Sequence, residues 1–386
     1  MVLKRMKDIC VKIGSGATPR GGKEAYSDAG VSLIRSQNVL DFSFSFNGLA
    51  HINDEQAKKL SNVIVKKDDV LLNITGDSVA RACIVEETVL PARVNQHVAI
   101  IRANPEIVIS SYLLCYLQTR KSYLLQLASG GATRNALTKK MLEELEIEIP
   151  TIEEQKKIVS IVDDLQRKIK KNNEINENLA ELLQTVYQER FGDVSTVTEQ
   201  GILSDICYYS RDRVVVSKLN ASTYFSTENM LPEKAGANEA ASLPNTLQTT
   251  ACHKGDTLIS NIRPYFKKIV YCEDGCGCST DVLCFTPVQP KYAAYLFSTL
   301  YADKFFAFMV AGSKGTKMPR GDKQQIMTYP VALPSDEELD EFNSLALPIL
   351  AQLHSNKAES KRLSATRDAL LPKLMSGEID VSGIQL

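Results

Sequence analysis

Ile149-Pro150-Thr151-Ile152-Glu153-Glu154 decides the fold, because a close copy, Leu333-Pro334-Ser335-Asp336-Glu337-Glu338, follows in the second half of the chain. The two prolines are 184 residues apart (334 − 150). Each stretch precedes a long run with the apolar periodicity of a helix. An internal repeat has to be weighed before any single motif. The chain is therefore interpreted as two copies of one plan, a globular domain followed by a long helix.

Shorter matches support the repeat at nearly the same offset. They combine a charged turn before an apolar strand, a second apolar strand, and a glycine loop that ends in Thr and a cation. The offset drifts by only a few residues, as insertions in loops would cause. The matched segments are 67–73 with 254–260, 96–101 with 280–285, and 130–134 with 313–317.

The composition is that of an ordinary globular protein. A chain of 386 residues can form two or more domains, and its 44% hydrophobic and 24% charged residues are average values. No apolar stretch approaches the ~18 residues of a membrane span, and the N-terminus lacks the apolar segment of a signal peptide. We therefore expect a cytoplasmic protein. The net charge of −1 gives no global sign of nucleic-acid binding, so any DNA contact must come from local clusters.

The nine cysteines are scattered and odd in number, and cytosolic thiols stay reduced, so disulfides are not expected. Cys272, Cys276, Cys278 and Cys284 form the densest group. Their spacing is not the paired C-x2-C of a structural zinc site, and buried Cys is a common small hydrophobe. No metal ligands are therefore predicted.

Apolar residues three and four positions apart predict two long helices, and Gly192 and Gly377 lie where each should stop. Strand-like and helical segments mix in the rest of the chain, so the fold class is α+β with two mixed domains. The predicted parts are a first globular domain over residues 1–150, a central helix over 151–192, a second domain over 193–334, a second helix over 335–376 and a tail over 377–386.

Connectivity determines how the two helices can pack. The first helix ends where the second domain begins, and the second helix begins where that domain ends. Helices that pack on each other must then run antiparallel, with the domains related by a pseudo-twofold axis. Asn172 and Asn356 interrupt the apolar seam, and they either hydrogen-bond each other and fix the register or point to solvent. The expected seam residues are Ile158, Leu165, Asn172, Leu179, Val186, Ile349, Asn356, Leu363 and Leu370.

The sequence lacks the motifs of several enzyme classes. The segment Asn261-Ile262-Arg263-Pro264-Tyr265-Phe266 lacks the double proline of an adenine methyltransferase loop. Gly14-Ser15-Gly16 lacks the third glycine of a dinucleotide turn, and no phosphate-binding loop for ATP is present. No catalytic residue and no bound cofactor are therefore predicted.

Polar and cationic residues instead gather in loops of both halves. Arg can read guanine edges, Asn and Gln adenine edges, and Ser, Thr and Lys can hold phosphates, although Gly, Asn and Ser are ordinary turn residues. A ~38-residue helix is about 57 Å long, which would suit two recognition domains on one split, asymmetric DNA site. The candidate DNA-binding residues are Ser15, Thr18, Arg20, Arg35, Gln37, Asn38, Asn73, Thr75, Asn95, Gln96, His97, Thr133, Arg134, Tyr209, Arg211, Arg213, Ser260, Asn261, Arg263, Tyr265, Lys267, Lys314, Thr316 and Lys317.

Several of these segments together resemble the specificity subunit of type I restriction–modification enzymes along essentially the whole chain. The first half contributes Gly14-Ser15-Gly16-Ala17-Thr18-Pro19, Arg35-Ser36-Gln37-Asn38-Val39, Asn73-Ile74-Thr75-Gly76, Asn95-Gln96-His97-Val98 and Ile149-Pro150-Thr151-Ile152-Glu153-Glu154-Gln155. The second half contributes Tyr224-Phe225-Ser226-Thr227-Glu228-Asn229-Met230 and Ser260-Asn261-Ile262-Arg263-Pro264-Tyr265-Phe266.

The resemblance implies two target-recognition domains joined by an antiparallel helical coil in a subunit without catalysis of its own. It also implies double-stranded DNA and two methyltransferase subunits as partners, with two restriction subunits in some complexes. S-adenosylmethionine, ATP and Mg²⁺ would be used by those partners. One departure is that the second helix lacks a counterpart of Gln155, which makes a partner contact there less secure. The alternatives are an orphan DNA-binding or anti-restriction protein with the same scaffold, and a coiled-coil scaffold that binds proteins.

Overall fold

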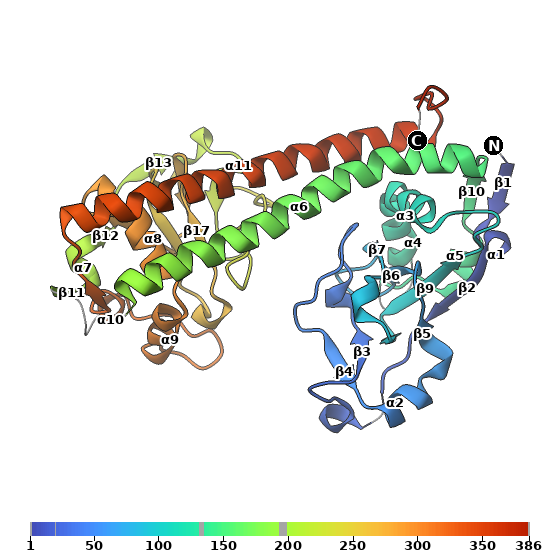
Figure 1. Ribbon diagram of the computed structural model, residues 1–386, viewed down its shortest axis with the longest axis horizontal. Helices are drawn as coiled ribbons and strands as arrows, with labels where there is room; N and C mark the ends of the chain where they lie inside the picture. Colours follow the sequence, from blue (N-terminus) through green and yellow to red (C-terminus); the bar gives the residue numbers. More distant parts are fainter. Residues whose placement is uncertain (1, 20, 131–134, 193–198, 385–386) are drawn as a thin grey trace. The chain divides into compact units, whose positions relative to one another are not determined.

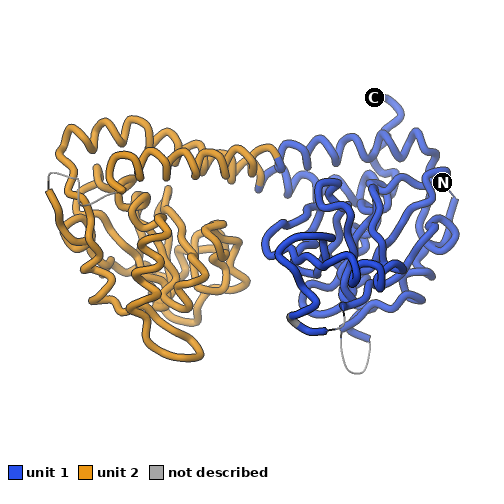
Figure 2. Tube along the Cα trace, turned by 60° about the horizontal axis from the view of Figure 1, so that its bottom comes forward, with its two compact units in different colours: residues 1–170, 361–386 blue, residues 171–360 orange. Residues whose placement is uncertain are grey.

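The computed structural model (Figure 1) describes residues 2–19, 21–130, 135–192 and 199–384. The chain divides into two compact units: unit 1 is Met1–Lys170 with Lys361–Leu386, and unit 2 is Lys171–Ser360 (Figure 2). Each unit thus holds one globular domain and a part of both long helices, whereas the predicted parts kept helices and domains separate. In the described residues, no helix has the length and apolar character to cross a membrane.

Unit 1 contains three sheets. A two-stranded sheet pairs β1 (Val2–Arg5) with β10 (Glu146–Ile149). The first four-stranded sheet is antiparallel and has the order β2 (Cys10–Ser15), β9 (Val98–Ala103), β6 (Val70–Asn73) and β7 (Ala82–Ile84). The second has the order β4 (Ala50–Ile52), β3 (Val31–Ile34), β8 (Ala92–Val94) and β5 (Ile64–Val65), with β3 and β8 parallel. The helices are α1 (Met6–Ile9), α2 (Asp54–Lys59), α3 (Ser110–Thr119), α4 (Lys121–Ser129) and α5 (Lys139–Glu143).

Unit 2 repeats this plan. Its two-stranded sheet pairs β11 (Gln200–Ile202) with β20 (Pro330–Ala332). The first four-stranded sheet has the order β12 (Cys207–Tyr209), β19 (Val282–Pro287), β16 (Thr257–Ser260) and β17 (Ile269–Tyr271). The second has the order β13 (Arg213–Val215), β15 (Gln248–Cys252), β18 (Cys276–Cys278) and β14 (Tyr224–Phe225). The helices are α7 (Leu203–Ile206), α8 (Ala293–Tyr301), α9 (Asp303–Ala311) and α10 (Lys323–Ile326).

The repeat holds at the level of single hydrogen bonds. The Lys66 amide donates to Asp69 at 2.7 Å, and in unit 2 the His253 amide donates to Asp256 at 2.8 Å. The two second sheets share three strands, β3-β8-β5 and β14-β18-β15, and differ at the edge: β4 extends the sheet beside β3, but β13 extends it beside β15. The predicted repeat and the α+β class are therefore confirmed, and the edge strand is where the two copies diverge.

The long helices are α6 (Ile152–Phe191) and α11 (Asp336–Met375). Both begin with a reciprocal capping box. The Thr151 amide donates to Glu154 at 2.9 Å and the Ser335 amide to Glu338 at 2.8 Å. The return bonds run from the Glu154 and Glu338 amides to the two hydroxyls, each at 3.3 Å. The segments 149–154 and 333–338 are thus two copies of one helix start.

The two helices pack antiparallel within each unit. In unit 1 the beginning of α6, with Ile158 and Val162, shares a core with Leu371 and Leu374 at the end of α11. In unit 2 the end of α6 shares a core with Leu339 at the beginning of α11. The predicted antiparallel coil is therefore confirmed. All nine seam residues are buried or half-buried.

The seam asparagines are buried, but they do not bond each other. Asn172 Nδ2 donates to Glu359 at 2.7 Å, and Asn356 Nδ2 donates to Asn176 Oδ1 at 2.9 Å. Because Asn356 faces Asn176 rather than Asn172, the register misses the expected pair by one helical turn. Each side-chain amide bonds to the other helix, so the prediction that the two asparagines point to solvent is wrong. The prediction that they bond each other is wrong as well.

Gln155 also has a structural role. It is fully buried in unit 1, where its amide accepts from the Ile109 amide at 3.0 Å and donates to Ile107 O at 2.9 Å. The corresponding position of α11 is Leu339 (155 + 184), which is fully buried in an apolar core. The missing glutamine in the second helix therefore goes together with an apolar core at that position.

Candidate nucleic-acid interface

In unit 1 the sheet topology brings three polar loops to one edge. Because β2 and β6 each run antiparallel to β9, the ends of β2 and β6 lie beside the start of β9. The Gly16 amide donates to Val98 O and the Ile74 amide to His97 O, both at 2.9 Å. These bonds hold the loops 16–19, 74–78 and 95–97 together.

A chain of side chains connects these loops at the surface. Thr18 Oγ1 donates to Gln96 Oε1 at 2.6 Å, and Thr75 Oγ1 lies 2.6 Å from His97 Nδ1. Gln96 Nε2 and His97 Nε2 are 3.3 Å apart. Thr18 and Gln96 are exposed, as is the nearby Ser15, and the other two are half-buried. Four of the predicted residues thus meet in one group that offers donors and acceptors to a partner.

Gly16 is required by this close approach. A Cβ atom there would lie 2.2 Å from both Val94 O and Asn95 O. Asn95 is buried, and its side chain accepts from the His97 amide at 3.1 Å. Asn95 therefore shapes the 95–97 turn and supports its neighbours rather than facing a ligand.

Other predicted residues of unit 1 maintain the loop structure. Asn38 and Asn73 are fully buried. Asn38 Nδ2 donates to Ser45 O at 2.9 Å, and Asn73 Nδ2 donates to Ser36 O at 2.9 Å. Arg35 and Gln37 both donate to Gly48 O, the latter at 3.1 Å. We therefore reassign Asn38 and Asn73 from base contact to loop support, because neither amide reaches the surface. Arg20, Thr133 and Arg134 lie outside the described residues.

Unit 2 builds the same edge with different side chains. The Asn261 amide donates to Asp281 O at 2.8 Å, as Ile74 does to His97. The Arg263 amide donates to Pro319 O at 2.8 Å, as Gly76 does to Asn135 O at 3.4 Å. Isolated bridges join Ile262 to Arg320 and Thr75 to Ala136 in the same way. The two units therefore present equivalent loops on one backbone frame.

Arg263 is the most unusual residue of this frame. Its φ is +51°, and the equivalent residue of unit 1 is Gly76, with φ +77°. Only glycine adopts this region without steric cost, and a residue such as Arg costs on the order of 1 kcal/mol there. An observed outlier of this kind indicates a function for the side chain.

Aromatic and cationic side chains surround Arg263. Tyr265 is 47% exposed and Phe266 37% exposed, with ring centroids 4.8 Å apart. Lys268 Nζ lies 5.9 Å from the Phe266 ring, and Lys267 forms an ion pair with Asp303 at 3.0 Å. Exposed rings beside cations are the pattern with which proteins stack on bases and hold phosphates.

The other predicted residues of unit 2 divide into two groups. Ser260 and Asn261 are buried, so they support the loop. Tyr209 is half-buried, and its hydroxyl donates to Lys323 O at 3.0 Å. The remaining group is exposed, and within it Lys314 is paired with Asp322 at 2.6 Å. This group comprises Arg211, Arg213, Lys314, Thr316 and Lys317.

Sequence reasoning missed Arg320, which lies on the same rim. Its guanidinium pairs with Asp281 at 2.9 Å, and both side chains are substantially exposed. The repeat offered a signal, because Asp281 aligns with the predicted residue His97. Phe266 lies between the predicted Tyr265 and Lys267, and Lys268 follows them in the same loop.

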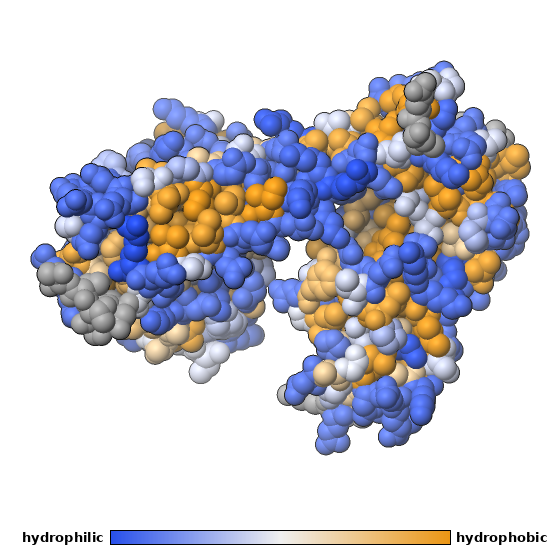
Figure 3. All heavy atoms as spheres, viewed as in Figure 1, coloured by the Kyte–Doolittle hydropathy of each residue, from blue (hydrophilic) through white to orange (hydrophobic). Residues whose placement is uncertain are grey.

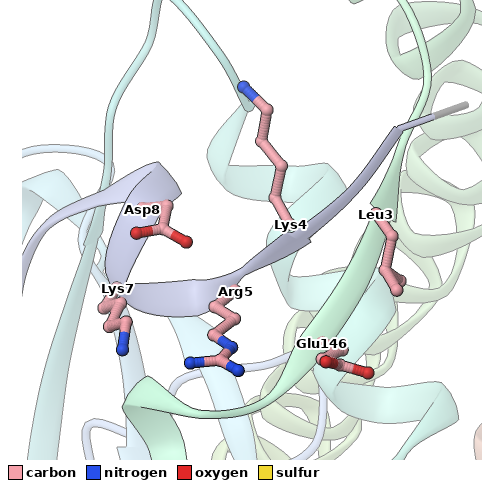
Figure 4. Close-up of a pocket in the computed structure, with 6 residues that line it drawn as sticks. All are labelled: Leu3, Lys4, Arg5, Lys7, Asp8 and Glu146. Carbon is pink, nitrogen blue, oxygen red and sulfur yellow. The ribbon is translucent and has the colours of Figure 1, made fainter.

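Two surface features of the units lie elsewhere. A pocket of about 440 Å³ in unit 1 is lined by Leu3, Lys4, Arg5, Lys7, Asp8 and Glu146 (Figure 4). Arg5 and Lys7 both pair with Glu144, at 2.9 and 2.7 Å, so this pocket carries no unbalanced positive charge. In unit 2 apolar side chains gather over the helices (Figure 3), and the exposed large apolar residues of α6 and α11 are Leu182, Leu345 and Leu347.

Comparison with known proteins points to one family. Residues 1–181 match the model of the type I restriction modification DNA specificity domain. The MjaIX specificity subunit of the type I restriction enzyme from Methanocaldococcus jannaschii is 25% identical over 98% of this chain and 93% of its own length. The EcoBI specificity subunit from Escherichia coli is 31% identical over 35% of this chain and 28% of its own length.

A solved structure has a similar fold. The S subunit of the type I restriction–modification system from M. genitalium aligns over 97% of this chain and 95% of its own, with a TM-score of 0.51 and 14% identity. At this identity the likeness concerns the fold alone.

Proposed function

We propose that this chain is a specificity subunit of a type I restriction–modification enzyme, as its similarity to such subunits supports, and that it recognises a split and asymmetric DNA site, one half with each unit. The observation that carries the proposal is the loop edge that recurs in both units with the same backbone hydrogen bonds and different side chains.

The asymmetry of the site follows from the substitutions on the shared frame. Gly76, His97 and Ala136 of unit 1 correspond to Arg263, Asp281 and Arg320 of unit 2. The edge of unit 1 is neutral and offers Gln96, whereas the edge of unit 2 offers Arg263 and Arg320. Gln favours adenine and Arg favours guanine, so the two edges should prefer different base pairs. The two half-sites should therefore differ in sequence.

Within each unit, different residues would take different roles. Thr18, Thr75 and the lysines 314 and 317 suit phosphate oxygens, which fix position without reading sequence. Gln96 in unit 1 and Arg263 with Arg320 in unit 2 suit base edges in the major groove. Tyr265 and Phe266, exposed beside Arg263, would add apolar contact.

The chemistry would reside in partner subunits. Two methyltransferase subunits would bind along the helices and methylate adenines with S-adenosylmethionine, and restriction subunits with ATP and Mg²⁺ would join them in some complexes. The exposed Leu182, Leu345 and Leu347 of unit 2 support such a contact, because exposed apolar patches mark protein interfaces. This chain would contribute recognition and no catalytic group.

A methylome with and without the chain tests the proposal. Deleting the gene from a strain that keeps the methyltransferase subunit should abolish N6-methyladenine at one bipartite, asymmetric motif, and plasmid expression should restore it. Unchanged adenine methylation after deletion would contradict the proposal. Retention of random duplex DNA by the purified complex, and its loss on omitting this chain, is the matched check in vitro.

A further inference from the structure

Five of the nine cysteines gather in one core of unit 2. This core lies between the sheet of β15 and β18 and the neighbouring strand β19, and it is almost fully buried. Its cysteines are Cys252, Cys272, Cys276, Cys278 and Cys284. The proposed recognition of DNA does not involve these thiols, since none of them belongs to the loop edge.

The repeat supplies an internal reference for this core. Cys252 pairs with Cys276 as Val65 pairs with Ala92. Leu258 pairs with Cys284 as Leu71 pairs with Ile100. By the same registers Cys278 corresponds to Val94, and the shared amide bond to Asp256 or Asp69 matches Cys272 to Val85. Aliphatic residues fill all five positions in unit 1, so packing alone does not call for thiols in unit 2.

The sulfurs of Cys272 and Cys276 are close enough to react, and the thiol of Cys252 also hydrogen-bonds that of Cys276. Cys272 Sγ and Cys276 Sγ are 3.5 Å apart and flank the turn Glu273-Asp274-Gly275. A disulfide requires about 2.05 Å between sulfurs, so the two sulfurs, now 3.5 Å apart, would have to move closer for the bond to form. Asp274 and Gly275 are exposed, so the pair lies just beneath the surface, with Cys276 7% exposed.

The surroundings favour Cys276 as the nucleophile. Hydrogen bonds from the thiols of Cys252 and Cys272 lower the pKa of Cys276. The same contact raises the pKa of Cys272, which keeps its proton. A thiolate and a neighbouring thiol are the two states that disulfide formation needs.

We propose that Cys272 and Cys276 form a redox-active dithiol, an oxidation site for small hydroperoxides. The Cys276 thiolate attacks a peroxide oxygen, which breaks the O–O bond, gives a sulfenic acid and releases hydroxide or an alkoxide. That anion takes from solvent the proton that Cys276 gave up, and leaves as water or an alcohol. Cys272 sulfur then attacks Cys276 sulfur, the S–O bond breaks, and the Cys272 proton leaves with the hydroxyl as water. The two thiols lose two electrons and two protons, and the peroxide gains them.

The described residues favour a thiol pair over a metal centre. Among them, no three His, Cys, Asp or Glu side chains are arranged to hold one metal ion. The dithiol also agrees with a reducing cytoplasm, because the bond would form only under oxidant and be reversed by cellular thiols.

Mass spectrometry of the full chain tests this proposal. The purified protein is treated with hydrogen peroxide, blocked with iodoacetamide and digested with trypsin, which releases residues 269–291 as one peptide. We expect that peptide to lose two hydrogens, the chain to lose two free thiols, and dithiothreitol to reverse both. Cys272→Val and Cys276→Ala introduce the residues that unit 1 carries at these positions, so both variants should fold.

The variants separate the two thiols. In Cys276→Ala, hydrogen peroxide should not convert any pair of free thiols to a disulfide. In Cys272→Val, it should give a sulfenic acid that accumulates and that dimedone traps. The control Cys278→Val, in the same core, should behave as the wild type. The proposal is overturned if the wild-type peptide keeps its hydrogens under conditions in which exposed thiols of a test protein oxidise. It is also overturned if a disulfide still forms in Cys276→Ala. Stoichiometric zinc that leaves only when the thiols are modified would overturn it as well.

Discussion

At the scale of single residues, the repeat makes each unit a control for the other. Asp69 and Asp256 occupy one position and are both almost fully buried. Arg102 donates two hydrogen bonds to Asp69, at 2.6 and 2.7 Å. Asp256 has no Arg partner: the His253 ring lies 3.8 Å from its carboxyl, and burial raises the pKa of that carboxyl. One position thus carries a carboxylate paired with Arg in unit 1 and a carboxyl without a guanidinium partner in unit 2.

This difference predicts opposite effects of one substitution. Asp69→Asn should lower the free energy of unfolding by about 1–3 kcal/mol, since Arg102 loses a charged partner. Asp256→Asn should leave stability unchanged or raise it at neutral pH, because the buried charge disappears. Chemical denaturation of the full chain, compared between the wild type and each variant, measures both changes in the free energy of unfolding. Equal losses in the two variants would contradict this assignment.

The same group gives a pH dependence. A raised pKa in the folded state means that the native chain binds the proton more tightly than the unfolded chain. The contribution of Asp256 to stability is therefore present below the ordinary Asp value of about 3.9 and is lost as pH rises through the raised folded pKa. Asp256→Asn should flatten the stability profile in that window, and a profile identical to that of the wild type would argue against a shifted carboxyl.

Arg263 and Gly76 form a second matched pair. Arg263→Gly should raise stability by about 1 kcal/mol, because glycine adopts φ +51° without strain. It should also weaken binding to the cognate duplex by about 1–3 kcal/mol if the guanidinium contacts a base. Gly76→Ala should lose about 1 kcal/mol, since a Cβ there has space but the wrong backbone region. A stabilised Arg263→Gly variant with undiminished affinity would make the side chain dispensable.

At the scale of elements, the long helices have two faces with different tasks. Leu183 is 1% exposed in the core of unit 2, and its neighbour Leu182 is 50% exposed. Leu183→Ala should destabilise by about 2–5 kcal/mol, measured by denaturation. Leu182→Ala should leave the denaturation midpoint unchanged and weaken copurification with the methyltransferase subunit. Equal binding by wild type and Leu182→Ala would remove this residue from the proposed contact.

The elements also show how far sequence reasoning reaches. The helices and their antiparallel packing could be predicted, because apolar periodicity is a local signal and the connectivity of the chain determines the direction in which the helices run. The tasks of Asn38 and Asn73 could not, because their partners at Ser45 and Ser36 come from loops whose shape is set by tertiary contacts. The predicted pairing of Asn172 with Asn356 was wrong by one helical turn. Apolar periodicity defines which face of a helix is buried, but not the axial position of the helix that packs against it.

At the scale of the whole molecule, the repeat would allow one chain to specify the proposed asymmetric site. The capping boxes and the hydrogen bonds of the loop edge are shared by both halves, whereas the exposed side chains on that edge differ. A duplicated frame with separate side chains lets each half of the site change without altering the other. The base sequence of the proposed DNA site depends on loop geometry, and no simple code links single residues to single bases.

Sequencing of modified adenines in cells that express the complex tests this central claim most directly. Three chains are compared: the wild type, Gln96→Ala in unit 1, and Arg263→Ala in unit 2. The account predicts that Gln96→Ala relaxes one half of the methylated motif, that Arg263→Ala relaxes the other half, and that each leaves the remaining half intact. Relaxation of the same half by both variants, or of both halves by either one, would contradict it.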